Sequence, residues 1–256
     1  MSKMIFFDID GTLLDHDKRL PQSTKDAIRQ LQSNGHRVAI ATGRGPFMFK
    51  TLREELGIQS YVSYNGQYVV WEGEPVYTNP ISRRLLHEVS EFAGRHRHPI
   101  VYMDHDSMKK NEHYHAYIEE SIATLKVAQP GHDPEYYKGR PIYQCLLFCT
   151  ADEEALYRER FGELDFIRWH RYSMDILPKG GSKAAGIEKL LDFLKLNRND
   201  VYAFGDYLND IEMLQYVGHG VAMGNAPDVV KKAAKHVTKD VGEDGIKYGL
   251  TMLGLL

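Results

Sequence analysis

The sequence predicts an α/β fold, with a doubly wound parallel sheet as its core and a second, α+β unit inserted into it. Near the N-terminus, short apolar runs alternate with amphipathic helical stretches, which is typical of a parallel sheet with right-handed crossovers. This alternation stops after Asn79-Pro80 and returns from Ser182. Because the segment between them has a different pattern, we expect a discontinuous core of residues 1–81 and 179–256 and a separate domain of residues 82–178.

The first part of the core begins with a strand. The apolar run Met4-Ile5-Phe6-Phe7 has no polar interruption, as expected of a strand that is covered on both faces. A helix over Ser23–Gln32 follows, with Pro21 and Gly35 as its start and stop signals. The next expected elements are a strand from Arg37 that ends in the turn Thr42-Gly43-Arg44, a helix over Phe47–Leu56, and further strand with a hairpin between Tyr61 and Tyr77.

The insert and the returning core are assigned in the same way. For the insert we expect helix Leu85–Phe92, strand Ile100–Met103, helix Tyr114–Leu125, strand Ile142–Cys149, helix Glu153–Phe161 and the closing strands Phe166–Arg171 and Met174–Leu177. The first pattern then returns as helix Ser182–Leu194, strand Val201–Phe204, helix Asp210–Tyr216, strand Gly220–Met223, helix Asp228–Ala234 and a last helix after Gly245. This order of elements favours a core assembled from both ends of the chain.

Composition and charge narrow the class of protein. With 256 residues, of which 43% are hydrophobic and 26% charged, the chain has enough apolar residues for a large core. A net charge of −3 gives no electrostatic reason to bind nucleic acid or an anionic membrane. No apolar stretch approaches the roughly 20 residues that span a bilayer, and no signal-peptide pattern opens the chain. We therefore expect a cytoplasmic protein without nucleic-acid or membrane partners.

The cysteines, Cys145 and Cys149, lie in one strand-like segment. Extended chain separates them by roughly 13 Å, at about 3.3 Å per residue. This distance is too long for a disulfide. We expect buried thiols, as in a reducing compartment.

Two carboxylates, Asp8 and Asp10, follow the first strand, and Gly11 closes the turn. Ligands of open α/β sheets bind beyond the carboxyl ends of the strands. Acids two positions apart on a strand project to the same side, and their repulsion is costly unless a cation or a shared proton offsets it. The segment therefore predicts a metal or a transferable phosphate nearby, with a simple Asp-Gly turn as the alternative.

Three further polar turns are expected beside Asp8 at the same edge of the sheet. Thr42-Gly43-Arg44 offers a hydroxyl and backbone amides to an anion, although the threonine could instead cap a helix. Gly180-Gly181-Ser182-Lys183 places a lysine at a helix N-terminus, where a cation is disfavoured unless it shares an anion with the helix; a solvated lysine is the alternative. Gly205-Asp206 through Asn209-Asp210 adds further carboxylates, and helix capping does not explain Asp206. A phosphoryl group with Mg²⁺ satisfies all of these turns.

These residues resemble the haloacid dehalogenase (HAD) superfamily of phosphohydrolases, and specifically its Cof-type branch, in which a large α/β cap of the C2 type is inserted into a Rossmann-like core. The resemblance covers the core at both ends of the chain, and the order and spacing of its four motifs make it specific. The matching segments are Asp8-Ile9-Asp10-Gly11-Thr12-Leu13, Ala41-Thr42-Gly43-Arg44, Lys183, and Gly205-Asp206 through Asn209-Asp210, with Met223-Gly224-Asn225-Ala226 as a further turn of the family.

The resemblance implies a role for each matching residue. Asp8 is expected to be the nucleophile and Asp10 the general acid and base. Asp8, Asp206 and the backbone carbonyl of Asp10 are expected to bind Mg²⁺, with Asp210 behind these ligands. The residues expected to contact the phosphate are Thr12, Thr42, Gly43, Lys183 and Asn209, and Arg44 and Asn65 are expected near the substrate at the cap hinge.

Two positions depart from the family pattern, since Tyr207 and Ala184 stand where glycine is common. Neither departure removes a catalytic group, but Tyr207 is large enough to narrow the mouth of the site. In the insert, His113 and His115 invite a zinc interpretation. We do not expect zinc there, because side chains two positions apart diverge on a helix and a structural zinc requires four ligands.

The expected function is Mg²⁺-dependent hydrolysis of small phosphate monoesters, such as sugar phosphates or related metabolites, through an aspartyl phosphate. The cap is expected to exclude water during the first step and to set specificity. The expected partner is therefore a small phosphorylated metabolite, and the sequence gives no oligomeric state. A phosphomutase and a non-catalytic regulator that binds phosphometabolites on the same fold are the alternatives.

Overall fold

A computed structural model describes residues 2–256, which divide into two compact units. The first unit contains the chain through Gly43, Lys50–Tyr77 and Ser182–Leu256, and the second contains Arg44–Phe49 and Thr78–Gly181. The core is therefore discontinuous in sequence.

The second unit extends a few residues beyond the boundaries expected at 81/82 and 178/179. The backbone N–H of Ile81 donates to the carbonyl of Ile142 (2.8 Å), and that of Lys179 donates to the carbonyl of Glu163 (3.2 Å). These hydrogen bonds tie the connecting segments to the insert, which accounts for the wider division.

The first unit is built on a sheet with the strand order β14-β13-β12-β1-β2-β3-β4-β5. In its middle, β1 (Met4–Phe7) pairs in parallel with both β12 (Val201–Gly205) and β2 (Arg37–Ala41). These parallel strands at the centre of the sheet confirm the predicted α/β core. The other strands are β13 (His219–Ala222), β14 (His236–Val237), β3 (Ser60–Ser63), β4 (Tyr68–Trp71), which runs antiparallel to β3, and β5 (Glu74–Thr78).

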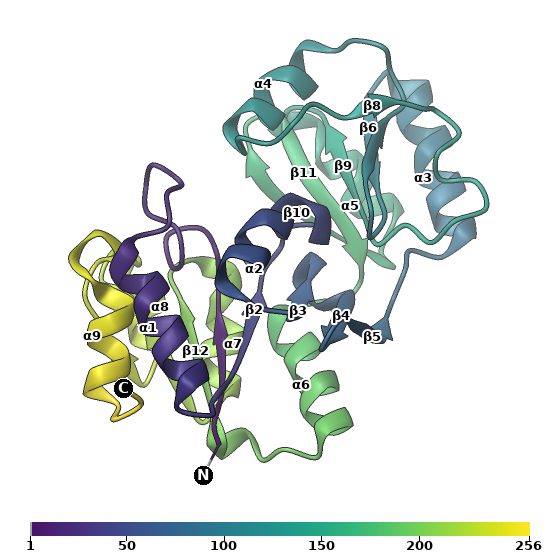
Figure 1. Cartoon of the computed structure of the whole chain (residues 1–256). Coiled ribbons are helices and arrows are strands. Elements are labelled where there is room, and N and C mark those ends of the chain that lie inside the picture. The colour runs from purple at the N-terminus through teal and green to yellow at the C-terminus, as the bar shows by residue number, and fades with distance from the viewer. Residues whose placement is uncertain (1) are drawn as a thin grey trace. The chain divides into compact units, whose positions relative to one another are not determined.

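The helices of the first unit come from both ends of the chain. In Figure 1 the first helix, in purple, lies side by side with the last, in yellow, and these two helices pack against each other. The helices are α1 (Gln22–Ser33), α2 (Lys50–Leu56), α6 (Lys183–Leu194), α7 (Ile211–Tyr216), α8 (Asp228–Ala233) and α9 (Gly245–Met252). Short 3-10 segments lie at Pro46–Phe49, Tyr64–Gly66, Ala151–Glu153, Arg198–Asp200, Leu208–Asp210 and Val241–Glu243 across the two units.

Both faces of the core sheet are covered. On one face, Phe6 of β1 lies in a buried cluster with Ile187 of α6. On the other face, the ring of Phe7 stacks on Phe204 with 5.1 Å between centroids. Gly249 of α9 approaches Phe204 so closely that a Cβ atom would lie 2.7 Å from its ring. Alternate residues of β1 therefore serve opposite faces, as a doubly wound fold requires.

The second unit is built on a sheet with the strand order β10-β11-β9-β6-β7-β8. Its pairs are antiparallel except for β7 and β8. On one face, Leu86 and Tyr157 from two helices lie in a buried cluster with Tyr102 and Leu147 of the strands. The elements are α3 (Arg83–His96), β6 (Ile100–Met103), β7 (Met108–Lys110), α4 (Ala116–Thr124), β8 (Gly131–His132), β9 (Gln144–Phe148), α5 (Ala155–Arg160), β10 (Leu164–His170) and β11 (Ser173–Pro178).

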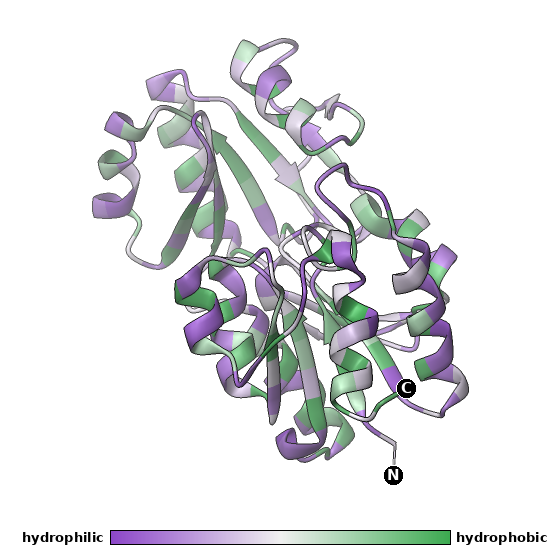
Figure 2. Ribbon diagram, turned by 90° about the vertical axis from the view of Figure 1, so that its left-hand side faces the viewer, coloured by the Kyte–Doolittle hydropathy of each residue, from purple (hydrophilic) through white to green (hydrophobic). Residues whose placement is uncertain are grey.

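Hydropathy follows this layered arrangement. Figure 2 shows the strands of both sheets largely in green, whereas the helices carry both green and purple segments. All four residues of β1 and all five of β9 are buried, as expected of strands covered on both faces. Between residues 2 and 256, no helix combines the length and the apolar character that crossing a bilayer would need.

Three short strands were not expected from the sequence, namely β7, β8 and β14. They have three, two and two residues and include Lys, His and Gly, so they carry no apolar run. Their extended conformation comes from pairing with a neighbour that is already in a sheet. Such tertiary pairing overrides local propensity.

The helix expected from Tyr114 begins only at Ala116. The side chain of His115 accepts a hydrogen bond from the backbone N–H of Tyr117 (3.2 Å) and thereby caps the helix. The interpretation of His113 and His115 as helical residues is therefore wrong. Because His115 is the N-cap, the helix begins after both histidines.

The cysteines behave as predicted. Cys145 lies in β9 and Cys149 follows the end of that strand, and both are buried free thiols. Burial raises the pKa of both thiols above the usual range. Neither is therefore activated as a thiolate nucleophile.

Candidate active site

The carboxyl ends of three adjacent strands bring the predicted polar turns together. Asp8 follows β1, Thr42 follows β2, and Asp206 follows β12. The backbone N–H of Asp8 donates to the carbonyl of Phe204 (3.0 Å), which continues the ladder between β1 and β12 to the first residue of the site. This is the edge at which open parallel sheets bind ligands.

Lys183 lies at the centre of this edge. Its Nζ is 2.5 Å from Oδ1 of Asp8 and 2.6 Å from Oδ1 of Asp210, and the lysine is only 1% exposed. It is the first residue of α6, where the helix dipole disfavours a cation. Burial opposes the charge of Lys183, but Asp210 and Asp8 outweigh it and raise the pKa of the ammonium. The lysine is therefore a buried cation shared by two carboxylates.

The position of α6 depends on close glycine contacts. A Cβ atom on Gly186 would lie 2.6 Å from the Cα of Gly66, and a Cβ atom on Gly66 would lie 2.2 Å from the carbonyl oxygen of Ser182. Gly66 also has φ +95°, which favours glycine. These contacts hold the first turn of α6, and with it Lys183, against the turn that follows β3.

Asp210 organises the turn after β12. Its side chain is fully buried, and its Oδ2 accepts hydrogen bonds from the backbone N–H groups of Asp206 (2.9 Å) and Tyr207 (3.0 Å). A Cβ atom on Gly205 would lie 2.6 Å from the Cγ of Asp210. Both oxygens of Asp210 are thus engaged, one by Lys183 and one by the turn, so this residue fixes the position of Asp206.

Asp206 is held by side chains from two other segments. Thr12 Oγ1 donates to its Oδ1 (3.2 Å), and Asn225 Nδ2 donates to its Oδ2 (3.2 Å). Asn225 Nδ2 also contacts the carbonyl oxygen of Gly11 (2.9 Å), and Asn225 Oδ1 accepts from the backbone N–H of Val241 (3.0 Å). Thr12 was expected at the phosphate, and the structure places its hydroxyl against this carboxylate.

Sequence reasoning did not include Asn225 among the site residues. Its only signal was the turn Met223-Gly224-Asn225-Ala226, which follows the strand β13 next to β12. An asparagine in such a turn ordinarily stabilises the turn by hydrogen-bonding the nearby backbone. The contacts to Asp206 and Gly11 become visible only when the strands are placed side by side.

The side chain of Asp10 is not part of the closely spaced acidic group. Its Oδ1 is 2.5 Å from Nζ of Lys18, and its side chain is 36% exposed. The acidic group whose ligand atoms lie within 4.8 Å of one another consists of Asp8, Asp206 and Asp210. The structure therefore brings Asp8 and Asp206 together as predicted and pairs the side chain of Asp10 with a lysine.

The predicted anion-binding turn after β2 is backed by asparagines. The backbone N–H of Asn65 donates to the carbonyl of Thr42 (3.1 Å), and Asn209 Nδ2 donates to Oδ1 of Asn65 (3.4 Å). A Cβ atom on Gly43 would lie 3.1 Å from Nδ2 of Asn65. Thr42, Gly43, Asn65 and Asn209 thus form one cluster, whereas Arg44 belongs to the segment grouped with the second unit.

Comparison with known proteins places this site in a family. A model described as haloacid dehalogenase-like hydrolase matches residues 5–250. The chain belongs to the haloacid dehalogenase-like hydrolases. It is 49% identical over 255 residues to the protein named "Putative phosphatase YkrA" of Bacillus subtilis (strain 168), with 100% of this chain and 99% of that protein covered.

Two solved structures extend this comparison. A hypothetical protein of Geobacillus kaustophilus HTA426 shares 52% identity with a TM-score of 0.97, and 100% of each chain is covered. A structure described as the HAD subclass IIB sugar phosphatase BT4131 shares 28% identity with a TM-score of 0.85, again over 100% of each chain. The order of motifs therefore identified the family correctly, and this HAD chain is a phosphatase.

The acidic cluster of this HAD phosphatase fits a divalent metal ion. Burial raises the pKa of Asp8, Lys183 opposes the rise, and the charges of Asp210 and Asp206 add to it. Burial and Asp210 raise the pKa of Asp206 to about 6. One ammonium does not balance three carboxylates, so a divalent cation would relieve the remaining repulsion.

Tyr207 is 59% exposed at the start of the turn that leads into α7.

In the second unit, the buried His98 is bonded through Nδ1 to the hydroxyl of Tyr157 (2.7 Å). His113 stacks on His132, with 3.6 Å between the ring centroids. Within residues 2–256, the acidic cluster of the first unit is the one group with the spacing of a metal site.

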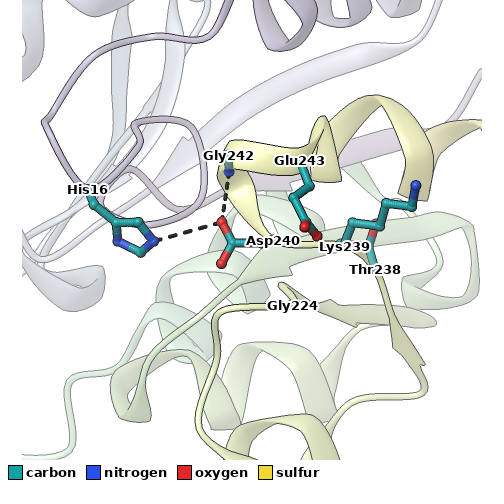
Figure 3. Close-up of a pocket in the computed structure, with 7 residues that line it drawn as sticks. All are labelled: His16, Gly224, Thr238, Lys239, Asp240, Gly242 and Glu243. Atoms are coloured by element: carbon teal, nitrogen blue, oxygen red, sulfur yellow. Dashed lines mark hydrogen bonds and ion pairs between the residues drawn. The ribbon is translucent and has the colours of Figure 1, made fainter.

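A pocket of the first unit lies beside the turn that contains Asn225 (Figure 3). His16 and Asp240 face each other across it, with 3.8 Å between Nε2 and Oδ1, and Asp240 also accepts from the backbone N–H of Gly242 (2.8 Å). None of the carboxylates of the acidic cluster lines this pocket. It therefore borders the loop that follows β1 and is separate from the candidate active site.

Proposed function

We propose that this phosphatase hydrolyses small phosphate monoesters, such as sugar phosphates or related metabolites, in a Mg²⁺-dependent reaction through an aspartyl phosphate on Asp8. The observation that carries the proposal is the buried ammonium of Lys183 between Asp8 and Asp210, with Asp206 in the same cluster. Its similarity to a protein described as a sugar phosphatase supports the substrate class.

Asp8, Asp206 and the backbone carbonyl of Asp10 would hold Mg²⁺, a hard cation that prefers oxygen ligands and retains water. The contacts of Asp206 with Thr12 and Asn225 leave it fixed for this role. When bound, the ion supplies charge neutralisation, which lets an anionic carboxylate approach an anionic ester.

Side chains of the candidate site would carry out the remaining steps of the reaction. The carboxylate of Asp8 attacks phosphorus and forms an aspartyl phosphate while the bond to the leaving oxygen breaks. Asp10 donates a proton to that oxygen and later takes a proton from the water that attacks the phosphorus atom of the intermediate, which regenerates Asp8. Thr42, Gly43, Lys183 and Asn209 would hold the phosphate oxygens, where negative charge gathers during the transfer.

Phosphate release from a panel of phosphorylated metabolites tests the proposal. We expect Mg²⁺-dependent release that is lost on chelation and restored by added Mg²⁺. The Asp8→Asn variant should be folded and inactive toward both sugar phosphates and an aryl phosphate. Retained activity in this variant would remove Asp8 as the nucleophile.

The same panel separates the alternatives. Isomerisation of a sugar phosphate with almost no free phosphate would identify a phosphomutase. Tight binding of a phosphometabolite without turnover would identify a regulator. Either result would replace the proposed hydrolysis.

A further inference from the structure

The loop that follows β1 is held in one conformation by its own hydrogen bonds. The carboxylate of Asp15 accepts from the backbone N–H groups of Asp17 (2.9 Å) and Arg19 (2.8 Å). The backbone groups of Asp15 and Arg19 are also paired (2.9 Å), and the N–H of Gly11 donates to the carbonyl of Leu14 (2.9 Å). The loop is thus a closed turn whose backbone conformation is held by these hydrogen bonds.

Lys18 has an unusual backbone conformation within this turn. Its φ is +62°, in the left-handed region that residues with a Cβ atom enter at a cost in energy. The backbone N–H of Lys18 donates to the carbonyl of Asp15 (2.9 Å), which stabilises that conformation.

The side chain of Lys18 reaches back to the beginning of the loop. Its Nζ is 2.5 Å from Oδ1 of Asp10, and the two side chains are 30% and 36% exposed. Asp10 is the residue that the proposed function requires for proton transfer to the leaving oxygen. The lysine therefore contacts the carboxylate on which the second half of the proposed chemistry depends.

A second side chain of the loop, His16, lies near the turn that contains Asp240. His16 lies across the pocket of Figure 3 from Asp240, with 3.8 Å between Nε2 and Oδ1. The same turn reaches Asn225 through the backbone N–H of Val241 (3.0 Å). The loop thus contacts Asp10 through Lys18 and lies beside this turn through His16.

The ion pair between Lys18 and Asp10 compensates the repulsion between Asp10 and the nearby carboxylates. Asp10 neighbours the acidic cluster, and its charge acts on both Asp8 and Asp206. Without a cation beside it, a carboxylate on this half-exposed loop would be repelled toward solvent, away from the reacting group. The ammonium of Lys18 offsets that repulsion and restricts the orientation of the carboxylate.

We propose that Lys18 is a positioning residue that holds the carboxyl group of Asp10 where it can exchange a proton with the leaving oxygen. The inference rests on the proposed function, because it gives Asp10 the role of general acid and base. Lys18 itself does not contact the reacting atoms. Misplacement of a catalytic group by about 1 Å is enough to lower a rate by about 100-fold.

The test compares leaving groups, because proton donation matters most when the leaving oxygen is strongly basic. Turnover of an alkyl phosphate, such as a sugar phosphate, and of 4-nitrophenyl phosphate is measured for Lys18→Met, Lys18→Arg and the wild type. We expect Lys18→Met to lower kcat for the alkyl ester by about 10- to 100-fold and for the nitrophenyl ester by less than about threefold, with KM little changed. Lys18→Arg should recover most of the loss, because it restores a cation beside Asp10.

Lys195→Met is the matched control. Lys195 is also a left-handed lysine, with φ +53°, and it is exposed at the end of α6. Its substitution removes the same charge and a side chain of the same length, so it should leave both activities unchanged. The thermal unfolding midpoint of each variant shows whether it is folded.

A double-mutant cycle shows whether Lys18 acts through Asp10. In the Asp10→Asn background, Lys18→Met should have no further effect on the alkyl ester, because the group it positions is gone. An equal loss with both esters, an unchanged alkyl rate, or an undiminished effect in the Asp10→Asn background would overturn the inference and leave the proposed function intact. Absence of phosphate release by the wild type from either ester would overturn the proposed function and the inference with it.

Discussion

Replacement of Lys183 by methionine should destabilise the first unit strongly and in a pH-dependent way. The lysine is 1% exposed, and the side chains of its partners Asp8 and Asp210 are 9% and 0% exposed. This burial decides the magnitude, because exposed ion pairs contribute about 0–1 kcal/mol, whereas removing one partner of a buried pair costs about 3–5 kcal/mol. In a chain of this size, such a loss corresponds to a decrease of roughly 10 °C in the unfolding midpoint.

The pH dependence has a definite sign. Burial already raises the pKa of Asp8 in the folded protein, and the loss of the ammonium raises it further above the unfolded value of about 3.9. Because the pKa of Asp8 is already about 8 in the wild type, the folded variant keeps a proton that the folded wild type begins to release as the pH approaches 8, so the stability of the variant falls relative to that of the wild type. The deficit relative to the wild type should therefore be larger at pH 8 than at pH 5.

Urea unfolding of the metal-free protein at both pH values measures this effect. Lys189→Met, on the exposed face of α6, is the matched control and should change stability by less than about 0.5 kcal/mol. Adding Asp8→Asn to Lys183→Met should recover part of the lost stability, because it removes one uncompensated charge. A Lys183→Met protein as stable as the wild type at pH 8 would refute the buried-pair reasoning, and so would a deficit that grows toward pH 5.

Three further outcomes are expected. Mg²⁺ should raise the unfolding midpoint of the first unit more at pH 8 than at pH 5, because Asp206, with a pKa of about 6, must lose its proton to bind the ion. Thermal unfolding with and without a chelator measures this difference, and equal shifts at the two pH values would contradict the prediction. Asn225→Ala should weaken the apparent Mg²⁺ affinity by about 10- to 100-fold, since it removes a donor that orients Asp206. The control Asn197→Ala, at the 3-10 turn before β12, should leave this affinity unchanged. A Mg²⁺ titration followed by the unfolding midpoint distinguishes the two variants. Gly11→Ala should abolish the Mg²⁺-dependent stabilisation and lower stability by more than about 1 kcal/mol, because φ is +76° and the new Cβ atom would lie 2.2 Å from Oδ2 of Asp206; wild-type behaviour in the same titration would show that the loop adapts.

The central strands could be predicted because their signals are local. The apolar runs of β1 and β12 and the helical spacing of α1 and α6 each reflect burial of one element, and parallel strands need helical crossovers. The strands β7, β8 and β14 carried no such signal, since their conformation depends on a neighbour. Element type was therefore predictable wherever the element buried its own apolar residues.

The residues of the candidate site likewise differ in whether a local sequence signal predicts them. Asp8, Lys183 and Asp206 were predictable, because each follows a strand or opens a helix at one edge of the sheet. Parallel topology brings them to one edge, whereas the 2.5 Å contact of Asp8 with Lys183 and the spacing below 4.8 Å within the acidic cluster are set by side-chain packing in the folded protein. Asn225 was visible only as a turn residue, since its partner Asp206 becomes its neighbour through the pairing of β12 with β13.

The net charge of the site becomes clear only when residues that are distant in sequence, such as Lys18 and Lys183, are placed together in the fold. Four carboxylates, Asp8, Asp10, Asp206 and Asp210, lie at this edge, and two ammonium groups, of Lys18 and Lys183, pair with three of them. The formal balance is −4 + 2 = −2 for these six groups, which matches one divalent cation. Removal of Lys183, which contacts Asp8 directly, would leave −3, so the repulsion between the site and an anionic ester would increase. The two lysines thus limit the negative charge of the site to what one divalent ion can neutralise, and an anionic substrate can then approach Asp8.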